Sequence, residues 1–424
     1  MRTLLAILPV MALLAGCGSN VASTKRDNLS YLYGQGSGGI LLNARVHHVT
    51  VGKSVLYYKL PTRDLLYKSD GSGSPFTAKV LLSYEAFADW NSKIVLDSAS
   101  TLIQDKALDP SDEKELIGSL NLRHLERNYY ILRVTARDLN RESQTTLIMR
   151  IEQQEKGIRQ YFLPIDQRNG LPRFNDQVGR GETLKVRCEA YSGKVLFGTY
   201  HRSTSTLPSP VFTSVTPTRS TPAVDSTFQV QVDAEEGTFT LALRSPGTYY
   251  LRPDTSDNKG FSVFVLDESY PYVGSSADML KPLRYITSLQ EFERISKASN
   301  VRQSIERFWM DAAADRERAR DAIRIYYGRV ENANNHFTAQ VEGWRTDRGL
   351  VHIIFGIPTS IYRSDLSETW VYGEENNMLS ITFTFTKRDN PFTNNDMVLD
   401  RDPTLKGAWY RNVESWRNGR VYQN

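Results

Sequence analysis

The chain has 424 residues, with 52 Lys and Arg against 48 Asp and Glu and a formal net charge of +4. So small a charge over this length excludes the broad basic surface with which proteins bind nucleic acids. The sequence contains only two cysteines, which excludes a disulfide framework and a cysteine-rich metal site, and its length predicts two to four domains.

The first residues, MRTLLAILPVMALLAGC, have the pattern of a bacterial secretory signal. Arg2 supplies a short positive region, and the apolar run at 4–14 is too short to span a bilayer. The last four of these residues, LAGC, resemble a lipobox, which implies removal of a signal peptide at 1–16 and diacylation of Cys17. The alternative is an ordinary cleaved signal with an incidental cysteine.

Two acyl chains on Cys17 would give durable membrane anchoring, where one chain would be marginal. Gly18 and Ser19 follow the cysteine in place of an Asp, which resembles the start of outer-membrane lipoproteins. Surface-exposed lipoproteins of Bacteroidota carry an acidic run near the cysteine, and this chain has none there. We therefore expect a lipoprotein anchored in the outer membrane and facing the periplasm.

The next two regions predict β domains. Residues 17–40 are polar and glycine-rich and predict a flexible tether. Residues 41–155 contain runs such as NYYILRVTARD, in which apolar and polar residues alternate. This period is typical of half-buried antiparallel sheets, and several such runs at short spacing predict an Ig-like β-sandwich domain.

A second Ig-like β-sandwich domain is predicted at 156–270. GTFTLALRSPGTYYLRPD has the pattern of a hairpin that turns at Pro246-Gly247, and Cys188 is expected to pack as a small apolar residue. Residues 203–227 are rich in Ser, Thr and Pro. Because proline cannot donate to a strand ladder, this stretch predicts a long exposed loop.

The last domain, at 275–424, is predicted to be α+β with an antiparallel sheet. A capping box at Ser288 opens a helix, and apolar stripes at helical spacing follow as far as residue 330. In GWRTDRGLVHIIFGIP, residues 343–358, we expect a tight turn at 346–349 and a central strand at 350–355. ETWVYGE and LSITFTFTK would complete a three-stranded meander.

The run YYGRVENANNHFTAQVEGWRTDRGLVHIIFGIP, followed by ETWVY, resembles the GWxTD domain family of Bacteroidota and related bacteria. The resemblance covers about the last third of the chain. It implies a lipoprotein with β-rich modules ahead of the signature domain, and it implies no known activity. The chain departs from the family in a continuous helical run at 310–320 and in Thr359 after Pro358. The motif residues are Gly343, Trp344, Thr346, Asp347, Arg348, Gly349, Gly356, Pro358, Trp370 and Tyr372.

These motif residues predict a structural corner rather than a catalytic centre. In an extended strand, Asp347 and His352 would be separated by about 16 Å, and no GxSxG elbow supplies a nucleophile. We expect Asp347 to bond backbone amides or Arg348 within the turn, and Trp344 to anchor the turn to the helices. The adjacent His47 and His48 would face opposite sides of a strand, so no metal site and no cofactor is expected.

Two functions fit these features. The first is a non-catalytic outer-membrane lipoprotein that acts as a periplasmic scaffold or accessory subunit of an envelope protein complex, for outer-membrane assembly or secretion. Its partners would be the membrane, through the lipid anchor, and other envelope proteins. The second is a glycan- or peptidoglycan-binding lipoprotein, with or without hydrolytic activity, because the many Tyr and Trp side chains offer stacking surfaces.

Overall fold

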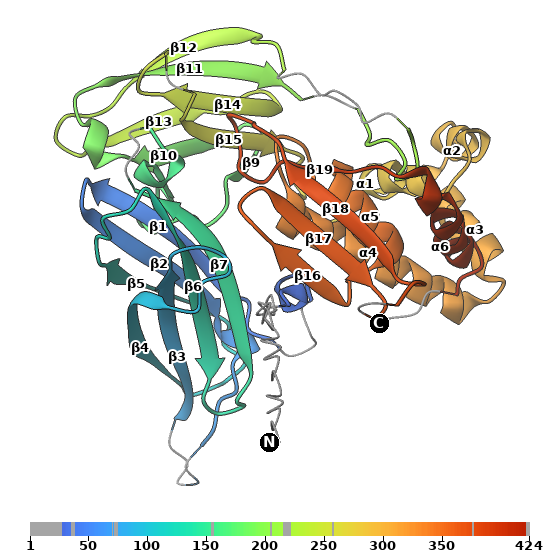
Figure 1. Cartoon of the computed structure of the whole chain (residues 1–424), viewed down its shortest axis with the longest axis horizontal. Helices are drawn as coiled ribbons and strands as arrows, with labels where there is room; N and C mark the ends of the chain where they lie inside the picture. Colours follow the sequence, from blue (N-terminus) through green and yellow to red (C-terminus); the bar gives the residue numbers. More distant parts are fainter. Residues whose placement is uncertain are drawn as a thin grey trace, which may run out of the picture.

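The structure is a computed structural model that describes residues 28–34, 39–69, 71, 75–153, 157–203, 206–214, 222–256, 258–374 and 377–420. The predicted signal peptide, Cys17 and residues 18–27 and 35–38 of the predicted tether lie outside the described residues. Two β-sandwiches precede an α+β region (Figure 1), which confirms the predicted fold class. Among the described helices, none is long and apolar enough to cross a membrane.

The first sandwich packs a three-stranded sheet on a four-stranded one. Along one central strand, Leu132, Val134 and Ala136 are fully buried while Arg137 is exposed, as the alternation predicts. The first sheet has the order β1 (Asn43–Thr50), β2 (Lys53–Pro61) and β5 (Glu115–Leu122), and the second has the order β4 (Val95–Ala107), β3 (Phe76–Phe87), β6 (Tyr129–Asp138) and β7 (Gln144–Glu152).

The second sandwich packs a three-stranded sheet on a five-stranded one, and Cys188 is fully buried in its core. The predicted hairpin at Pro246-Gly247 is wrong, because its two strands belong to different sheets. β13 pairs with β10, whereas β14 pairs with β11 and β15. The three-stranded sheet has the order β13 (Thr238–Ala242), β10 (Thr183–Arg187) and β8 (Leu163–Ile165). The five-stranded sheet has the order β12 (Ser226–Gln231), β11 (Val195–Arg202), β14 (Gly247–Arg252), β15 (Phe261–Leu266) and β9 (Gln177–Gly179).

The C-terminal region places helices on one face of an antiparallel sheet (Figure 1). The predicted capping box is present, with Ser288 and Glu291 exchanging bonds at the start of α2. The predicted continuous helix at 310–320 is wrong, because the chain leaves the helix at Ala314 and Asp315 caps a new one. The elements are α1 (Ser276–Leu280), α2 (Leu289–Ser296), α3 (Val301–Ala313), α4 (Arg316–Phe337), α5 (Asp347–Phe355), β16 (Ser360–Arg363), β17 (Ser367–Tyr372), β18 (Ile381–Lys387), β19 (Met397–Leu399) and α6 (Lys406–Arg417).

The predicted tight turn at 346–349 and strand at 350–355 are wrong. These residues form helix α5, which begins after its cap at Thr346. Every residue of α5 is buried, so the stretch at 350–355 is apolar on all sides except at His352, and periodicity cannot distinguish such a buried strand from a buried helix. The sheet instead has the order β16-β17-β18-β19, and β17 and β18 are the two strands that the sequence predicts.

Part of the predicted tether is an ordered element of the C-terminal region. Leu29 and Tyr33 are 6% and 5% exposed, and they belong to the same core as α4 and α5. The Leu29 amide donates to the Ile361 carbonyl at 2.9 Å, so residues 28–34 lie along the edge strand β16 (Figure 1).

The predicted loop at 203–227 is exposed only in part. Within it, the segment at 206–214, which we call the strap, crosses to the C-terminal region. Val211 is fully buried in that core, and its carbonyl accepts from the Asp402 amide at 3.2 Å. Arg401 donates to the Ser209 carbonyl at 3.1 Å. The strap therefore fastens the second sandwich to the last domain.

Replacing Val211 with Asp is expected to detach the strap, because a carboxylate would then be buried without a partner. Protease cleavage within 206–214 should rise at least ~10-fold, since cleavage follows the population of the open form. The matched control is Val224→Asp, at a position in the same connection that is 53% exposed. Equal cleavage rates in the two variants would contradict the docking of the strap.

Candidate functional site

Two signature glycines allow the backbones of three segments to come into direct contact. A Cβ on Gly343 would lie 2.0 Å from the carbonyl oxygen of Ala333 in α4. A Cβ on Gly349 would lie 2.0 Å from the carbonyl oxygen of Gly343. Since real Cβ atoms do not approach oxygen so closely, α4, the turn at 343–345 and α5 can pack together only without these side chains.

Trp344 and Thr346 hold this corner together. Trp344 is 6% exposed and lies against the Tyr285 ring, whose hydroxyl donates to the Trp344 carbonyl at 2.8 Å. The Thr346 hydroxyl donates to the Gly343 carbonyl at 2.7 Å and accepts from the Gly349 amide at 3.1 Å. Trp344 therefore packs among the helices, as predicted, and Thr346 is the N-cap of α5.

Asp347 bonds the strand β19 directly and is linked to the strap through Arg401. Its carboxylate accepts from Arg401 at 2.6 Å and from the Leu399 amide at 2.9 Å, and the residue is 7% exposed. Asp347 thus accepts from a backbone amide, but this amide belongs to Leu399 of β19 and not to the predicted turn, and Arg348, the predicted alternative partner, pairs with Glu368. Because Arg401 also holds Ser209, one ion pair ties α5 to β19 and to the strap.

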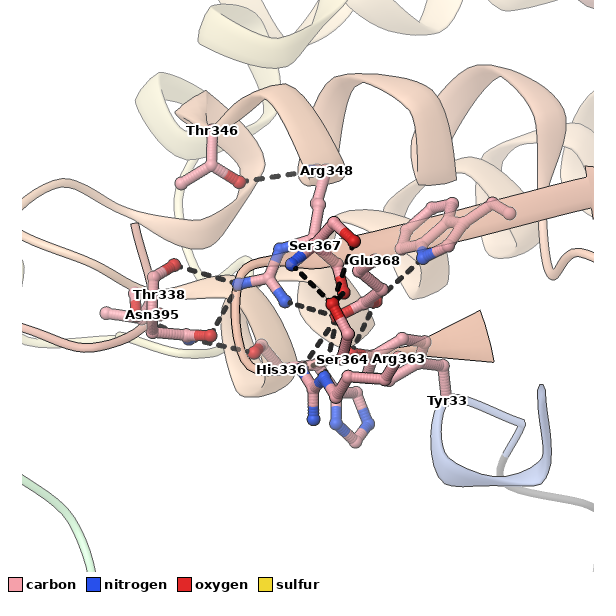
Figure 2. Close-up of polar contacts among 12 residues, drawn as sticks. Tyr33, His336, Thr338, Thr346, Arg348, Arg363, Ser364, Ser367, Glu368 and Asn395 are labelled. Atoms are coloured by element: carbon pink, nitrogen blue, oxygen red, sulfur yellow. Dashed lines mark hydrogen bonds and ion pairs between the residues drawn. The ribbon is translucent and has the colours of Figure 1, made fainter. Parts of the chain in front are cut away.

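Arg348 forms a buried ion pair with Glu368 of β17. The two residues are 1% and 0% exposed, and Arg348 Nη1 lies 3.2 Å from Glu368 Oε2. Arg363 reaches the same oxygen at 2.7 Å. The other oxygen, Oε1, accepts from the Tyr33 hydroxyl at 2.8 Å and from Trp370 Nε1 at 2.7 Å (Figure 2). A single carboxylate therefore serves four side chains.

The charge of Glu368 is stabilised in spite of its burial. Burial alone would raise the pKa of this carboxyl, but Arg363 and Arg348 outweigh that effect and lower the pKa to about 2. Arg348 also donates to the Asn395 carbonyl at 2.8 Å and to the Asn395 side chain, and its guanidinium lies 5.0 Å from the centre of the Phe337 ring. Arg348 thus joins α5 to β17, to the end of α4 and to the loop before β19.

The remaining motif residues lie around the C-terminal end of α5. The Tyr372 hydroxyl donates to the Gly356 carbonyl at 2.9 Å, and Pro358 is buried. Arg329 of α4 donates to the Ile353 carbonyl at 3.2 Å, so it satisfies a backbone group that the end of a helix leaves open. The fully buried Trp370 completes the core beneath.

Sequence reasoning missed five residues of this network: Tyr33, Arg363, Glu368, Asn395 and Arg401. One of them carries a signal in the sequence. Every second residue of the strand ETWVY points to the same face, and these residues are Glu368, Trp370 and Tyr372. The pattern therefore places a carboxylate on the face that carries the aromatic side chains. Tyr33, Asn395 and Arg401 are remote in sequence from the motif, Arg363 lies between Pro358 and Trp370, and no local pattern marks any of these four.

Asp347 and three of the histidines each have their own partners within the protein. Asp347 turns to Arg401, and His352 packs on Phe337 with ring centres 5.7 Å apart. His47 bonds Gln160 and Glu189, while His48 bonds Ser54 and Glu152. In the described part of the chain, no group of three or more His, Cys, Asp or Glu side chains is placed to hold a metal ion.

A depression beside Trp344 has an empty volume of about 340 Å³, open solvent included. Its acidic side chains already have partners within the protein. Asp267 pairs with Lys281 at 3.2 Å, and Glu342 pairs with Arg345 at 2.6 Å. Asp278 caps α1 through Ser275. Each of these three acidic side chains is therefore held by a neighbour in the sequence or in the fold.

Two buried histidines give the domain an expected pH dependence. Burial, with Arg329 and His336 adding to it, lowers the pKa of His352 to about 3, and burial together with Arg348 lowers the pKa of His336 to about 4. Both folded values lie below the unfolded value of about 6.5. Each ring is therefore neutral when folded and takes up a proton on unfolding at low pH.

The stabilising contribution of these rings is present above about pH 6.5 and is lost as the pH falls from there, towards 4 for His336 and towards 3 for His352. The free energy of unfolding should fall by about 1.4 kcal/mol per pH unit for each ring. Glu368 contributes to the slope only below about pH 4.5, because its pKa is lowered to about 2. Chemical denaturation between pH 7 and 5 should show a smaller slope for His352→Gln. Equal slopes would contradict this prediction.

The GWxTD domain family matches the chain over residues 247–418. In a comparison with curated proteins, no match was found. Among solved structures, a glycosyl hydrolase family 2 member from Bacteroides cellulosilyticus is 14% identical, with 27% of this chain and 14% of that chain covered and a TM-score of 0.19. A Bacteroides uniformis beta-glucuronidase is 12% identical, with 36% of this chain and 15% of that chain covered and a TM-score of 0.18. The red sea bream transglutaminase is 10% identical, with 54% of this chain and 31% of that chain covered and a TM-score of 0.19.

The chain spans less than a third of these solved proteins, and scores so low carry no functional inference. The family match begins at the first residue of β14, so it includes the last two strands of the second sandwich. The buried network described above lies within the matched region, apart from Tyr33. The chain therefore carries a GWxTD domain, over residues 247–418.

Proposed function

We propose that the protein is a non-catalytic outer-membrane lipoprotein, acylated at Cys17, that acts as a periplasmic scaffold in an envelope complex for outer-membrane assembly or secretion. The observation that carries this proposal is the use of the signature residues. Asp347 and Arg348 are both buried in ion pairs that join distant segments of the chain. In this proposal, the motif residues hold the domain together, and exposed surfaces elsewhere on the protein bind its partners.

The described part of the anchor segment supports a role at the membrane. Residues 28–34 pack in the core of the GWxTD domain, and Leu29 also lies beside Trp90 of the first sandwich. Cys17 precedes Asn28 by eleven residues, which span at most about 40 Å when fully extended. A lipid on Cys17 would hold the GWxTD domain close to the membrane.

The contacts between domains support a rigid scaffold. Asp365 at the β16–β17 turn accepts from Trp90 at 3.1 Å, Tyr129 at 2.7 Å and Arg150 at 2.8 Å of the first sandwich. Arg45 of the first sandwich pairs with Asp176 of the second at 2.5 Å. Together with the strap, these contacts fix the order and direction of the three units.

Site-specific photo-crosslinking in native membranes tests this function. A photoreactive residue at Tyr272 or Tyr410, which are 63% and 54% exposed on the GWxTD domain, should form adducts with subunits of an assembly or secretion complex. The matched control is Val51, 73% exposed at a hairpin of the first sandwich. Recovery of glycan or peptidoglycan fragments alone, with no protein adduct, would contradict the scaffold and favour a glycan-binding lipoprotein.

A further inference from the structure

The hairpin between β17 and β18 presents two large apolar side chains to water. Met378 is 100% exposed and Leu379 is 88% exposed. Local hydrogen bonds hold residues 377–380, because the Leu379 amide donates to the Asn377 side chain at 2.9 Å and the Ser380 hydroxyl donates to the Glu374 carbonyl at 2.6 Å. Neighbouring exposed apolar side chains held in this way indicate a contact surface.

The described chain begins at the same end of the sheet. Asn28 Nδ2 donates to the Thr359 carbonyl at 2.9 Å, and the Gly373 amide at the base of the hairpin donates to the Thr359 hydroxyl at 3.1 Å. Ile381 of β18 pairs with Tyr372, next to Gly373. Met378, three residues before Ile381, therefore lies within about 11 Å of the base of the hairpin.

We propose that the hairpin tip at 377–380 inserts Met378 and Leu379 into the interfacial region of the bilayer that holds the lipid on Cys17. This inference rests on the proposed lipid anchor. The segment leading back to Cys17 starts at Asn28, so the anchor and the tip approach the membrane from one end of the sheet. Because the anchor keeps the tip close to the bilayer, a weak apolar contact is enough to hold one orientation.

The charge next to the tip indicates the kind of lipid. Glu374 lies at the base of the hairpin, and a carboxylate there is repelled by anionic headgroups. The tip therefore suits zwitterionic lipids. Two contacts, one acyl anchor and one apolar tip, would fix the tilt of the GWxTD domain and aim the two sandwiches away from the membrane.

A dye that senses polarity tests the contact. The acylated full chain with Met378→Cys is labelled and reconstituted in vesicles of phosphatidylethanolamine and phosphatidylcholine. The buried Cys188 stays unlabelled, since burial raises the pKa of its thiol to about 12. The emission should shift to shorter wavelength and be quenched by spin-labelled lipids. The matched control is Leu108→Cys, a position that is 88% exposed after β4 in the first sandwich.

Equal emission from dyes at 378 and 108 would overturn the inference. A shift at 378 without quenching by the lipid labels would also overturn it, because the tip would then be covered by protein or by a second copy. Mass spectrometry of the amino-terminal peptide separates this failure from that of the proposed function. An acylated Cys17 with an unshifted dye rejects the tip contact alone, whereas an unmodified Cys17 rejects both.

Discussion

Replacing Glu368 with Gln is expected to unfold the GWxTD domain. The change removes the only charge that faces both Arg348 and Arg363 in this buried network, while the shape of the side chain stays almost the same. Breaking a buried ion pair from one side typically destabilises a protein by about 3–5 kcal/mol, and here two guanidinium groups lose the carboxylate that they share. Such a loss is comparable to the whole stability of an ordinary domain.

Thermal unfolding followed by tryptophan fluorescence would measure this effect, since Trp370 donates to Glu368 and reports on the site. The matched control is Glu293→Gln, which removes an exposed pair with Lys297 on α2 and should change stability by about 0.5 kcal/mol or less. If the two variants had the same Tm, the buried network would not be the element that holds the domain together.

The β architecture was predictable because its pattern is local. Period-two alternation identifies β6, β17 and β18 directly from neighbouring residues. The helix α5 was not predictable in this way, because a nine-residue run that is buried on all sides has no polar face to set a period. The information that decides for a helix lies in Thr346 and Gly349, whose side chain and amide form the cap.

The strap and the segment at 28–34 could not be predicted for a different reason. Each is short and borders a polar or glycine-rich stretch, and each is held by one or two buried apolar side chains, Val211 in the strap and Leu29 and Tyr33 at the other segment. A single buried residue in a Ser-, Thr- or Gly-rich stretch produces no periodicity. Its burial depends on a surface that only the folded domain provides.

The boundary between the second sandwich and the last domain is also set by packing. Tyr250 of β14 and Phe264 of β15 form one cluster with Phe392, which follows β18. The Tyr250 and Phe392 rings lie 5.2 Å apart. The family match from residue 247 therefore covers a unit that shares side-chain packing, although its first two strands belong to the sandwich sheet.

Replacing Gly349 with Ala is expected to disrupt the same domain through the backbone rather than through charge. The new Cβ would lie 2.0 Å from the carbonyl oxygen of Gly343 and 3.0 Å from the Cα of Trp344. Neither neighbour is a flexible side chain, so α5 would have to move away from the turn. That movement would pull Arg348 from Glu368, and we expect a loss of about 3 kcal/mol or more.

Gly328→Ala is the matched control, because the same substitution is made in a helix of the same domain. Gly328 lies within α4, and a Cβ there would meet nothing within 4 Å. Alanine is favoured over glycine in a helix interior by about 0.8–1 kcal/mol, so this variant should be more stable than the parent. The two glycine variants should therefore shift the denaturation midpoint in opposite directions. A stable, folded Gly349→Ala protein would show that α5 can be displaced. In that case the close approach of α5 to the turn would not explain the glycine at position 349.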